Sequence, residues 1–141
     1  MLTGSRRAVR LPVSYFASLV QRTPSPAVRD NPGEYSRLVA RFAQQTRLVA
    51  TPGNRDRLVA KFLEAAEIQR DNPDCELMFV SASTTEASVV YLTEVWASEQ
   101  HWEYARHSDA ITAWSKGMSS LVAEPPASTA FTPIGGKGLR E

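Results

Sequence analysis

Histidine is the side chain whose ordinary pKa lies nearest neutrality, and this sequence contains two, His101 and His107. Either could carry a proton in a reaction at neutral pH, and either could instead be a structural or solvated residue of a helix. Two histidines cannot build a three-histidine metal site, and one cysteine, Cys75, cannot build a cysteine-based zinc cluster. We therefore expect no metal, and proton transfer is the chemistry that the histidines would supply.

Two other features could be taken for reactive sites. Cys75 has no neighbouring base or cation in its strand, which favours an inert small hydrophobic side chain over a nucleophile. The segment Gly135-Gly136-Lys137-Gly138 suggests phosphate binding, but it lacks the spacing, the following Ser or Thr and the helix of a P-loop. We interpret it as a C-terminal arm.

Apolar periodicity and turn signals indicate the elements that must position these residues. Residues 42–50 alternate in part and end at Thr51-Pro52-Gly53, which predicts a strand closed by a turn. A helix is expected from Asn54, as its N-cap, to about Arg70. Strands at 75–80 and 89–96 flank a polar hairpin loop at 83–88. Ser98 and Ser108 can cap helices over 99–106 and 109–121, and residues 129–134 form the last predicted strand.

This order, β-α-β-β-α-β, is typical of the ferredoxin-like α+β fold, in which helices cover one face of a four-stranded antiparallel sheet. The other face stays bare, and an apolar bare face indicates a homodimer. The tetrapeptide Arg-Leu-Val-Ala occurs at 37–40, 47–50 and 57–60, but ten residues are too few for a structural repeat. We expect its copies to lie in different secondary structures.

Length and composition are those of one globular domain, with 141 residues of which 43% are hydrophobic and 22% charged. The prolines between residues 23 and 33 predict a linker, so that 1–34 is an extension and 35–141 the folded domain. No apolar stretch approaches the roughly 18 residues of a membrane span. We therefore expect a cytoplasmic protein that does not enter a membrane.

Charge is divided unevenly along the chain. Residues 1–29 contain five arginines and no acid, and the remainder then holds 11 basic and 15 acidic side chains, a net charge of −4. An acidic domain is a poor surface for nucleic acid, so we expect no nucleic-acid partner. The basic extension could be an arginine-rich targeting peptide, a floppy terminus, or sequence upstream of the true start.

Four segments carry a resemblance to a known family. They are Thr51-Pro-Gly-Asn-Arg-Asp-Arg-Leu, Tyr91-Leu-Thr-Glu-Val-Trp-Ala-Ser-Glu-Gln, Leu121-Val-Ala-Glu-Pro-Pro and Pro133-Ile-Gly-Gly-Lys-Gly. In this order and spacing, over about Phe42 to Leu139, the sequence resembles the antibiotic biosynthesis monooxygenase family and its quinol monooxygenase-like members. The resemblance implies a dimeric α+β barrel that oxygenates an electron-rich aromatic with O2, without metal, haem or flavin.

The resemblance also implies which side chains contact the substrate. Trp96 stands at the family's tryptophan position and would line the pocket, unless it is simply a core residue. Trp102 falls where some of these enzymes carry a phenol, and its indole N–H could bind a quinone oxygen but cannot titrate; the alternative is core packing. Leu92 replaces an amide side chain of those enzymes, which removes a polar contact. Lys116 replaces an arginine, and helical spacing directs it to solvent.

Glu94 and His107 are the candidate catalytic residues, as proton acceptors. Glu94 shares one face of its strand with Trp96, where burial would raise its pKa and make it a base; alternatively it pairs with an arginine. Many family members place a histidine in the first half of the following helix. By spacing from Trp96 that position is Ala105 here, so His107 comes two residues late and His101 four early.

A haem cofactor is not expected. The haem-degrading branch of the superfamily uses a histidine late in the second helical region and an asparagine on the first strand. Those positions correspond to Trp114 and to Gln44 or Gln45 in this chain.

Two functions remain open on the sequence alone. The first is a cofactor-independent monooxygenase that oxidises a hydroquinone or a phenolic, polyketide-type aromatic with O2. The second is a non-catalytic dimeric barrel that binds a small aromatic ligand. The motifs together favour the enzyme, whereas the apolar Leu92 and Ala105 favour the binding protein.

Overall fold

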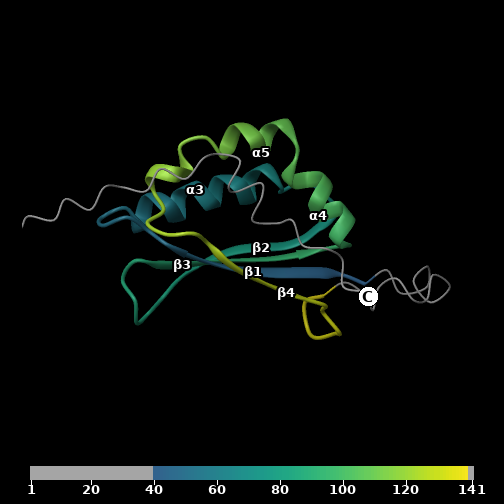
Figure 1. Cartoon of the computed structure of the whole chain (residues 1–141). Helices are drawn as coiled ribbons and strands as arrows, with labels where there is room; N and C mark the ends of the chain where they lie inside the picture. The colour runs from purple at the N-terminus through teal and green to yellow at the C-terminus, as the bar shows by residue number, and fades with distance from the viewer. Residues whose placement is uncertain (1–39, 140–141) are drawn as a thin grey trace, which may run out of the picture.

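A four-stranded antiparallel sheet, covered on one face by helices, is the framework of the protein (Figure 1). The computed structural model describes residues 40–139 of the chain, so the expected extension 1–34 and the start of the expected domain at residue 35 lie outside the described residues. The strands are β1 (Phe42–Val49), β2 (Cys75–Ala82), β3 (Val89–Trp96) and β4 (Ala127–Phe131). The helices are α3 (Arg55–Ile68), α4 (Glu99–Arg106), α5 (Asp109–Trp114) and the 3-10 turn η2 (Met118–Ser120).

The strand order β2-β3-β1-β4, with every neighbouring pair antiparallel, confirms the ferredoxin-like α+β fold. Of the repeated tetrapeptides, residues 47–50 lie at the end of β1 and residues 57–60 in α3, as expected; the copy at 37–40 begins outside the described residues. Within residues 40–139, no helix is long and apolar enough to cross a bilayer.

Side-chain caps fix two of the helices. The Ser98 hydroxyl accepts the N–H of His101 at the start of α4, and the Ser108 hydroxyl accepts the N–H of Ile111 at the start of α5, which confirms both predicted caps. Asn54 is the N-cap residue of α3, as predicted, but its side chain accepts no N–H of the helix; its amide donates instead to Thr51 Oγ1 at 2.8 Å.

Two predicted boundaries were wrong. The helix expected over 109–121 ends at Trp114, because Gly117 adopts φ +85°, a left-handed conformation that no α-helix continues through. The chain resumes in η2, which still buries Met118. The last strand is Ala127–Phe131 instead of 129–134, because its pairing with β1 runs from Ala127 to Phe131 and Pro133 has no N–H for a ladder.

Strand register arranges the side chains in rows across the sheet. Two rows in the middle of the face that the helices cover contain polar side chains. One contains Met78, Glu94, Gln44 and Ala130, and the next contains Val80, Leu92, Thr46 and Ser128. At the end of the sheet beyond Gln44 and Glu94, Phe42 lies opposite Trp96. Polar side chains therefore occupy the middle of the covered face, between apolar clusters built around Leu58 and Trp96.

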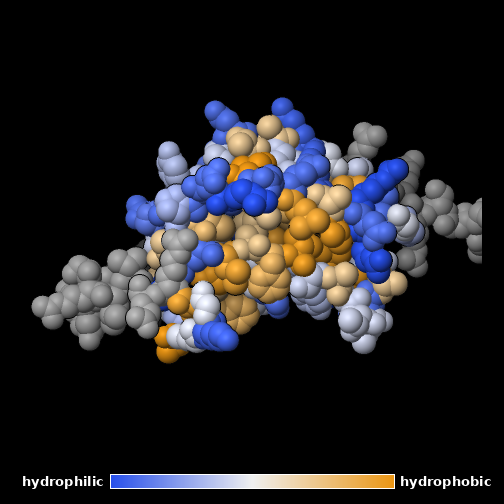
Figure 2. Space-filling view, turned by 180° about the vertical axis from the view of Figure 1, so that it is seen from behind, coloured by the Kyte–Doolittle hydropathy of each residue, from blue (hydrophilic) through white to orange (hydrophobic). Residues whose placement is uncertain are grey.

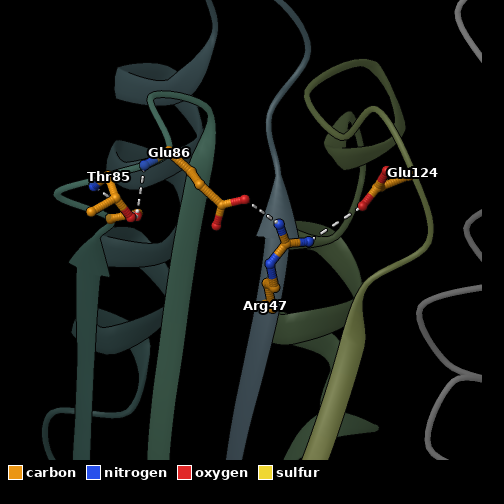
Figure 3. A network of polar contacts seen from close by, with 5 residues as sticks. Arg47, Thr85, Glu86 and Glu124 are labelled. Carbon is orange, nitrogen blue, oxygen red and sulfur yellow. Dashed lines mark hydrogen bonds and ion pairs between the residues drawn. The ribbon is translucent and has the colours of Figure 1, made fainter.

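The bare face of the sheet carries the opposite kinds of side chain. Its first row, which we call the apolar row, crosses all four strands and consists of Leu77, Val95, Ala43 and Phe131. The far end of this face is charged: Arg47 on β1 bonds Glu86 at 3.2 Å and Glu124 at 3.4 Å (Figure 3). These ion pairs tie the β2–β3 hairpin and the segment before β4 to the central strand.

Candidate functional site

A cavity of about 280 Å³ lies between the covered face of the sheet and the helices α3, α4 and α5. Its walls are mainly apolar and include Leu48, Phe62, Ala65, Leu92, Trp96, Trp102, Ile111 and Trp114. The polar side chains that reach it from the sheet are Gln44, Thr46, Glu94 and Ser128. A largely apolar cavity with a few convergent polar groups is typical of a small-molecule site.

Glu94 is the ionisable group buried in this cavity wall. The residue is 8% exposed, and burial raises the pKa of its carboxyl to about 7, while a hydrogen bond from Trp96 acts in the opposite direction. The Trp96 indole N–H donates to Glu94 Oε1 at 3.3 Å, whereas Oε2 receives no hydrogen bond from the residues that the structure describes. A carboxyl that changes charge near neutral pH, with one oxygen held and one available, is suited to accept a proton.

The two tryptophans expected at the substrate both line the cavity. Trp96 is almost fully buried and is held by its bond to Glu94. Trp102, on α4, packs on Phe42 with ring centroids 4.8 Å apart and has the Arg106 guanidinium 5.2 Å from its own ring centroid. Both residues are therefore at once core residues and part of the cavity wall, so the two interpretations do not exclude each other. Leu92 lines the same wall.

A hydrogen-bonded chain of polar groups crosses the cavity floor from β1 to β4. The Gln44 amide donates to Thr46 Oγ1 at 3.3 Å, and Thr46 Oγ1 lies 3.0 Å from Ser128 Oγ. Gln44 is directly opposite Glu94 in the β1–β3 register. The floor thus offers uncharged donors and acceptors beside a carboxyl, which could hold an oxygen atom of a ligand.

His107 lies at the solvent-exposed side of the cavity. Its side chain is 60% exposed, and its Nε2 is 3.6 Å from the Glu103 carboxylate. Arg106 also contributes to the lining and is paired with Glu103 at 2.9 Å. His107 and Glu94 therefore border the same cavity, His107 at its exposed side and Glu94 in its buried wall.

Three other candidates lie away from the cavity. His101 bonds Ser98 Oγ through Nδ1 at 2.7 Å and lies 3.6 Å from Asp74. Cys75 is half-buried, and burial together with the charge of Glu94 raises the pKa of its thiol to about 11, which agrees with an inert side chain. Lys116 is exposed, as expected, although it follows the end of α5 and is not in a helix.

Sequence reasoning missed Gln44, Thr46 and Ser128 as parts of the site. Alternation along β1 places Gln44 and Thr46 on one face, and that signal was available. No signal in the sequence indicated the residues opposite them, because the pairing of β1 with both β3 and β4 joins residues that are far apart in the chain. Within residues 40–139, no group of three or more His, Cys, Asp or Glu side chains is placed to hold a metal ion.

Comparison with known proteins identifies the family. The family model for antibiotic biosynthesis monooxygenase matches residues 41–117, more than half of the chain. The chain belongs to the antibiotic biosynthesis monooxygenase family. The match spans β1 to α5, and so includes the strands that carry Gln44, Thr46 and Glu94.

Solved structures agree with this family fold. A provisionally named antibiotic biosynthesis monooxygenase from Chloroflexus aurantiacus is similar over 69% of this chain and 96% of its own, with 24% identity and a TM-score of 0.62. One from Caulobacter crescentus, also provisionally named, is similar over 68% of this chain and 92% of its own, with 21% identity and a TM-score of 0.63.

A protein from Mycobacterium tuberculosis covers 70% of this chain and 99% of its own, with 19% identity and a TM-score of 0.62. At these identities the likeness is one of fold. No curated protein matches the sequence.

Proposed function

We propose that the protein is a cofactor-independent monooxygenase that oxidises a hydroquinone or related phenolic, polyketide-type aromatic with O2. The observation that carries the proposal is Glu94, a buried carboxyl whose pKa of about 7 lets it take a phenolic proton in an otherwise apolar cavity. A phenolic anion can pass an electron to O2 unaided. The protein therefore has to bind the ring, take the proton and exclude water.

Each candidate residue has a role in this reaction. The substrate ring lies between the sheet and the helices, against Trp96 and Trp102, and its hydroxyl faces Glu94. After proton transfer, one oxygen atom enters the ring to give the quinone and the other leaves as water. His107, at the exposed side of the cavity, passes the proton to solvent.

A homodimer in the cytoplasm is part of the proposal. Three large apolar side chains on the bare face are about half exposed in the single chain: Leu77 at 45%, Phe79 at 44% and Phe131 at 51%. Figure 2 shows the molecule from behind, with the helices still above the sheet, and has hydrophobic surface in the middle of the view below hydrophilic side chains. A second copy that covers the bare face would bury Leu77, Phe79 and Phe131.

Oxygen uptake tests the proposal. Purified protein treated with a metal chelator is assayed with an oxygen electrode against a panel of benzo- and naphthohydroquinones, and we expect turnover. Glu94→Gln keeps the shape of the side chain but cannot accept the proton, and should lower the rate by about 10²–10⁴-fold. Trp96→Phe, which removes the indole N–H bond to Glu94, should lower it less. Glu64→Gln is the matched control, because Glu64 is an exposed carboxyl on α3.

The non-catalytic alternative keeps one supporting observation, the apolar Leu92 and Ala105 in the cavity wall. It predicts binding without turnover. Quenching of tryptophan fluorescence by the hydroquinones, with no oxygen uptake by folded protein across the panel, would establish the binding protein and overturn the enzyme.

A further inference from the structure

A second buried amide borders the cavity, on the helix side. Gln69 directly follows α3 and is 7% exposed, and it lines the cavity from the same helix face as Phe62 and Ala65. Its backbone is held on both sides: its N–H donates to the Ala65 carbonyl at 3.2 Å, and its carbonyl accepts the N–H of Asn72 at 3.0 Å. The Gln69 side chain therefore starts from a defined position opposite the sheet.

Hydrogen bonds in the turn after α3 determine which way the Gln69 amide points. The backbone N–H of Asp74 can only donate, and it bonds Asn72 Oδ1 at 3.0 Å. The other polar atom of the Asn72 side chain is therefore its amide nitrogen, which donates to Gln69 Oε1 at 2.9 Å. The oxygen of the Gln69 amide is thus held by Asn72, and its nitrogen, Nε2, points away from that bond.

Gln69 Nε2 carries two N–H donors, and neither has a partner among residues 40–139. In this part of the chain no buried side-chain nitrogen or oxygen is both unbonded and sealed off, so Nε2 borders open space. Because Gln69 is almost fully buried and lines the cavity, that space is the cavity. An unsatisfied buried donor costs free energy, which indicates that a ligand in the cavity accepts from it.

A carbonyl oxygen is the acceptor that fits this donor best. It accepts without donating, just as an amide nitrogen donates without accepting. A hydroxyl group would also have to direct its own hydrogen to an acceptor, and the neighbours of Gln69 on the helix face, Phe62 and Ala65, offer none in their side chains. A carboxylate would bring a full charge into a buried wall, at a larger desolvation cost than a neutral carbonyl.

We propose that Gln69 is a specificity-determining residue, which donates from Nε2 to a carbonyl oxygen of the ligand and so selects phenols or hydroquinones that carry a carbonyl group. The inference rests on the proposed function for the place of the phenolic ring in the cavity, but not for its reaction with O2. No covalent bond to Gln69 forms or breaks in that reaction. Its effect is on which molecule binds and in which orientation.

Calorimetric titration under argon tests the inference, because it measures binding in the absence of the oxidant. The probes are naphthols that carry an acetyl group at different ring positions, each paired with the naphthol that carries an ethyl group at the same position. Within a pair, the acetyl-to-ethyl ratio of affinities reports the contact with the carbonyl oxygen. We expect the largest ratio of the wild-type protein to fall about 10-fold in Gln69→Met, which keeps the length of the side chain but has no donor.

A second variant leaves Gln69 in place and turns its amide round. In Asn72→Asp the new carboxylate can only accept, so it should keep the bond from the N–H of Asp74 and accept from Gln69 Nε2 as well. The Gln69 oxygen then faces the cavity and repels a carbonyl oxygen, so the ratio should again fall about 10-fold or more. Gln100→Met is the matched control, because Gln100 is an exposed amide on α4 that does not line the cavity, and it should leave the ratio unchanged.

A ratio that stays at the wild-type value in either Gln69→Met or Asn72→Asp overturns the inference, and so does binding of the ethyl naphthols alone. Failure of every probe to bind at millimolar concentration removes the expected place of the phenol, and with it the inference. Oxygen uptake is measured separately and is decided by none of these results. The expected ratios without uptake would support the non-catalytic binding protein, whereas uptake without them would leave the monooxygenase with another source of specificity.

Discussion

Each face of the sheet departs in one place from the usual distribution of side chains. The face that the helices cover carries Gln44, Thr46, Glu94 and Ser128 in its middle rows, whereas the bare face carries the apolar row, of which Leu77 and Phe131 are exposed in the single chain. Burial of a polar group costs free energy unless it is bonded, and exposed apolar surface gains free energy when it is covered. Both departures from the simple pattern therefore point to something outside the chain: a ligand on one face and a partner on the other.

The same strands supply both faces, so each residue step along β1 changes the role of the side chain. Ala43 belongs to the apolar row and Gln44 to the cavity floor. A shift of one residue in register would exchange the two sets. At the far end of the bare face, Arg47 bonds the loops on both sides of β1.

The largest expected effect comes from placing a charge on the bare face. Phe79→Asp puts a carboxylate where we expect apolar contact with the second copy, because Phe79 is 44% exposed beside the apolar row. Burying an unpaired charge costs several kcal/mol, so the dimer should weaken by at least about 100-fold. Sedimentation velocity across a concentration series measures the change.

A control for that experiment is Ala60→Asp, which adds the same charge at an exposed position of α3, away from the sheet. It should leave the dimer intact. If Phe79→Asp and the wild type sediment alike, the bare face is not the partner surface, and its apolar row needs another explanation.

An effect of similar size is expected on the covered face, where the ionisation of Glu94 should make the free energy of unfolding depend on pH. Glu94 has a folded-state pKa of about 7 against an ordinary value of 4.5, so the folded protein binds its proton more tightly than the unfolded chain does. The contribution of Glu94 to the free energy of unfolding is therefore fully present below pH 4.5 and is lost as the pH rises to about 7. The wild-type free energy of unfolding should fall by up to about 3 kcal/mol over this range relative to Glu94→Gln.

Urea unfolding of both proteins at pH 4.5, 6 and 7.5, at one protein concentration, measures this difference. The other titrating groups are common to both proteins, so their contributions cancel. A difference that stays constant with pH would mean that the carboxyl is hydrated in the folded state, and would remove the physical basis for a base at this position.

Local sequence patterns were enough to predict the fold and part of the site. Alternation and turn residues located β2, β3 and α3, and the hydroxyls of Ser98 and Ser108 act through the nearest N–H groups of their own helices. The shared face of Glu94 and Trp96 followed from the period of two in a strand. These predictions hold because each depends on residues close together in the chain.

What depends on distant pairing could not be predicted. The polar floor exists because β1 lies between β3 and β4, which brings Thr46 opposite Ser128, 82 residues later. The end of α5 depends on one backbone conformation at Gly117, which apolar spacing alone does not reveal. Whether His107 acts in the reaction stays a prediction, since its ring borders the cavity but is mostly exposed.

The smallest expected effect lies at the charged end of the bare face. Arg47→Met keeps the aliphatic stem but removes both ion pairs, whose partners Glu86 and Glu124 are more than half exposed. Exposed pairs contribute little and are screened by salt, so we expect the thermal midpoint to fall by about 2 °C or less, with the difference vanishing at high salt. The dimer should persist, because contact is expected at the apolar row. Loss of the dimer in Arg47→Met would mean that the second copy covers the charged end as well, and that the partner surface extends over the whole bare face.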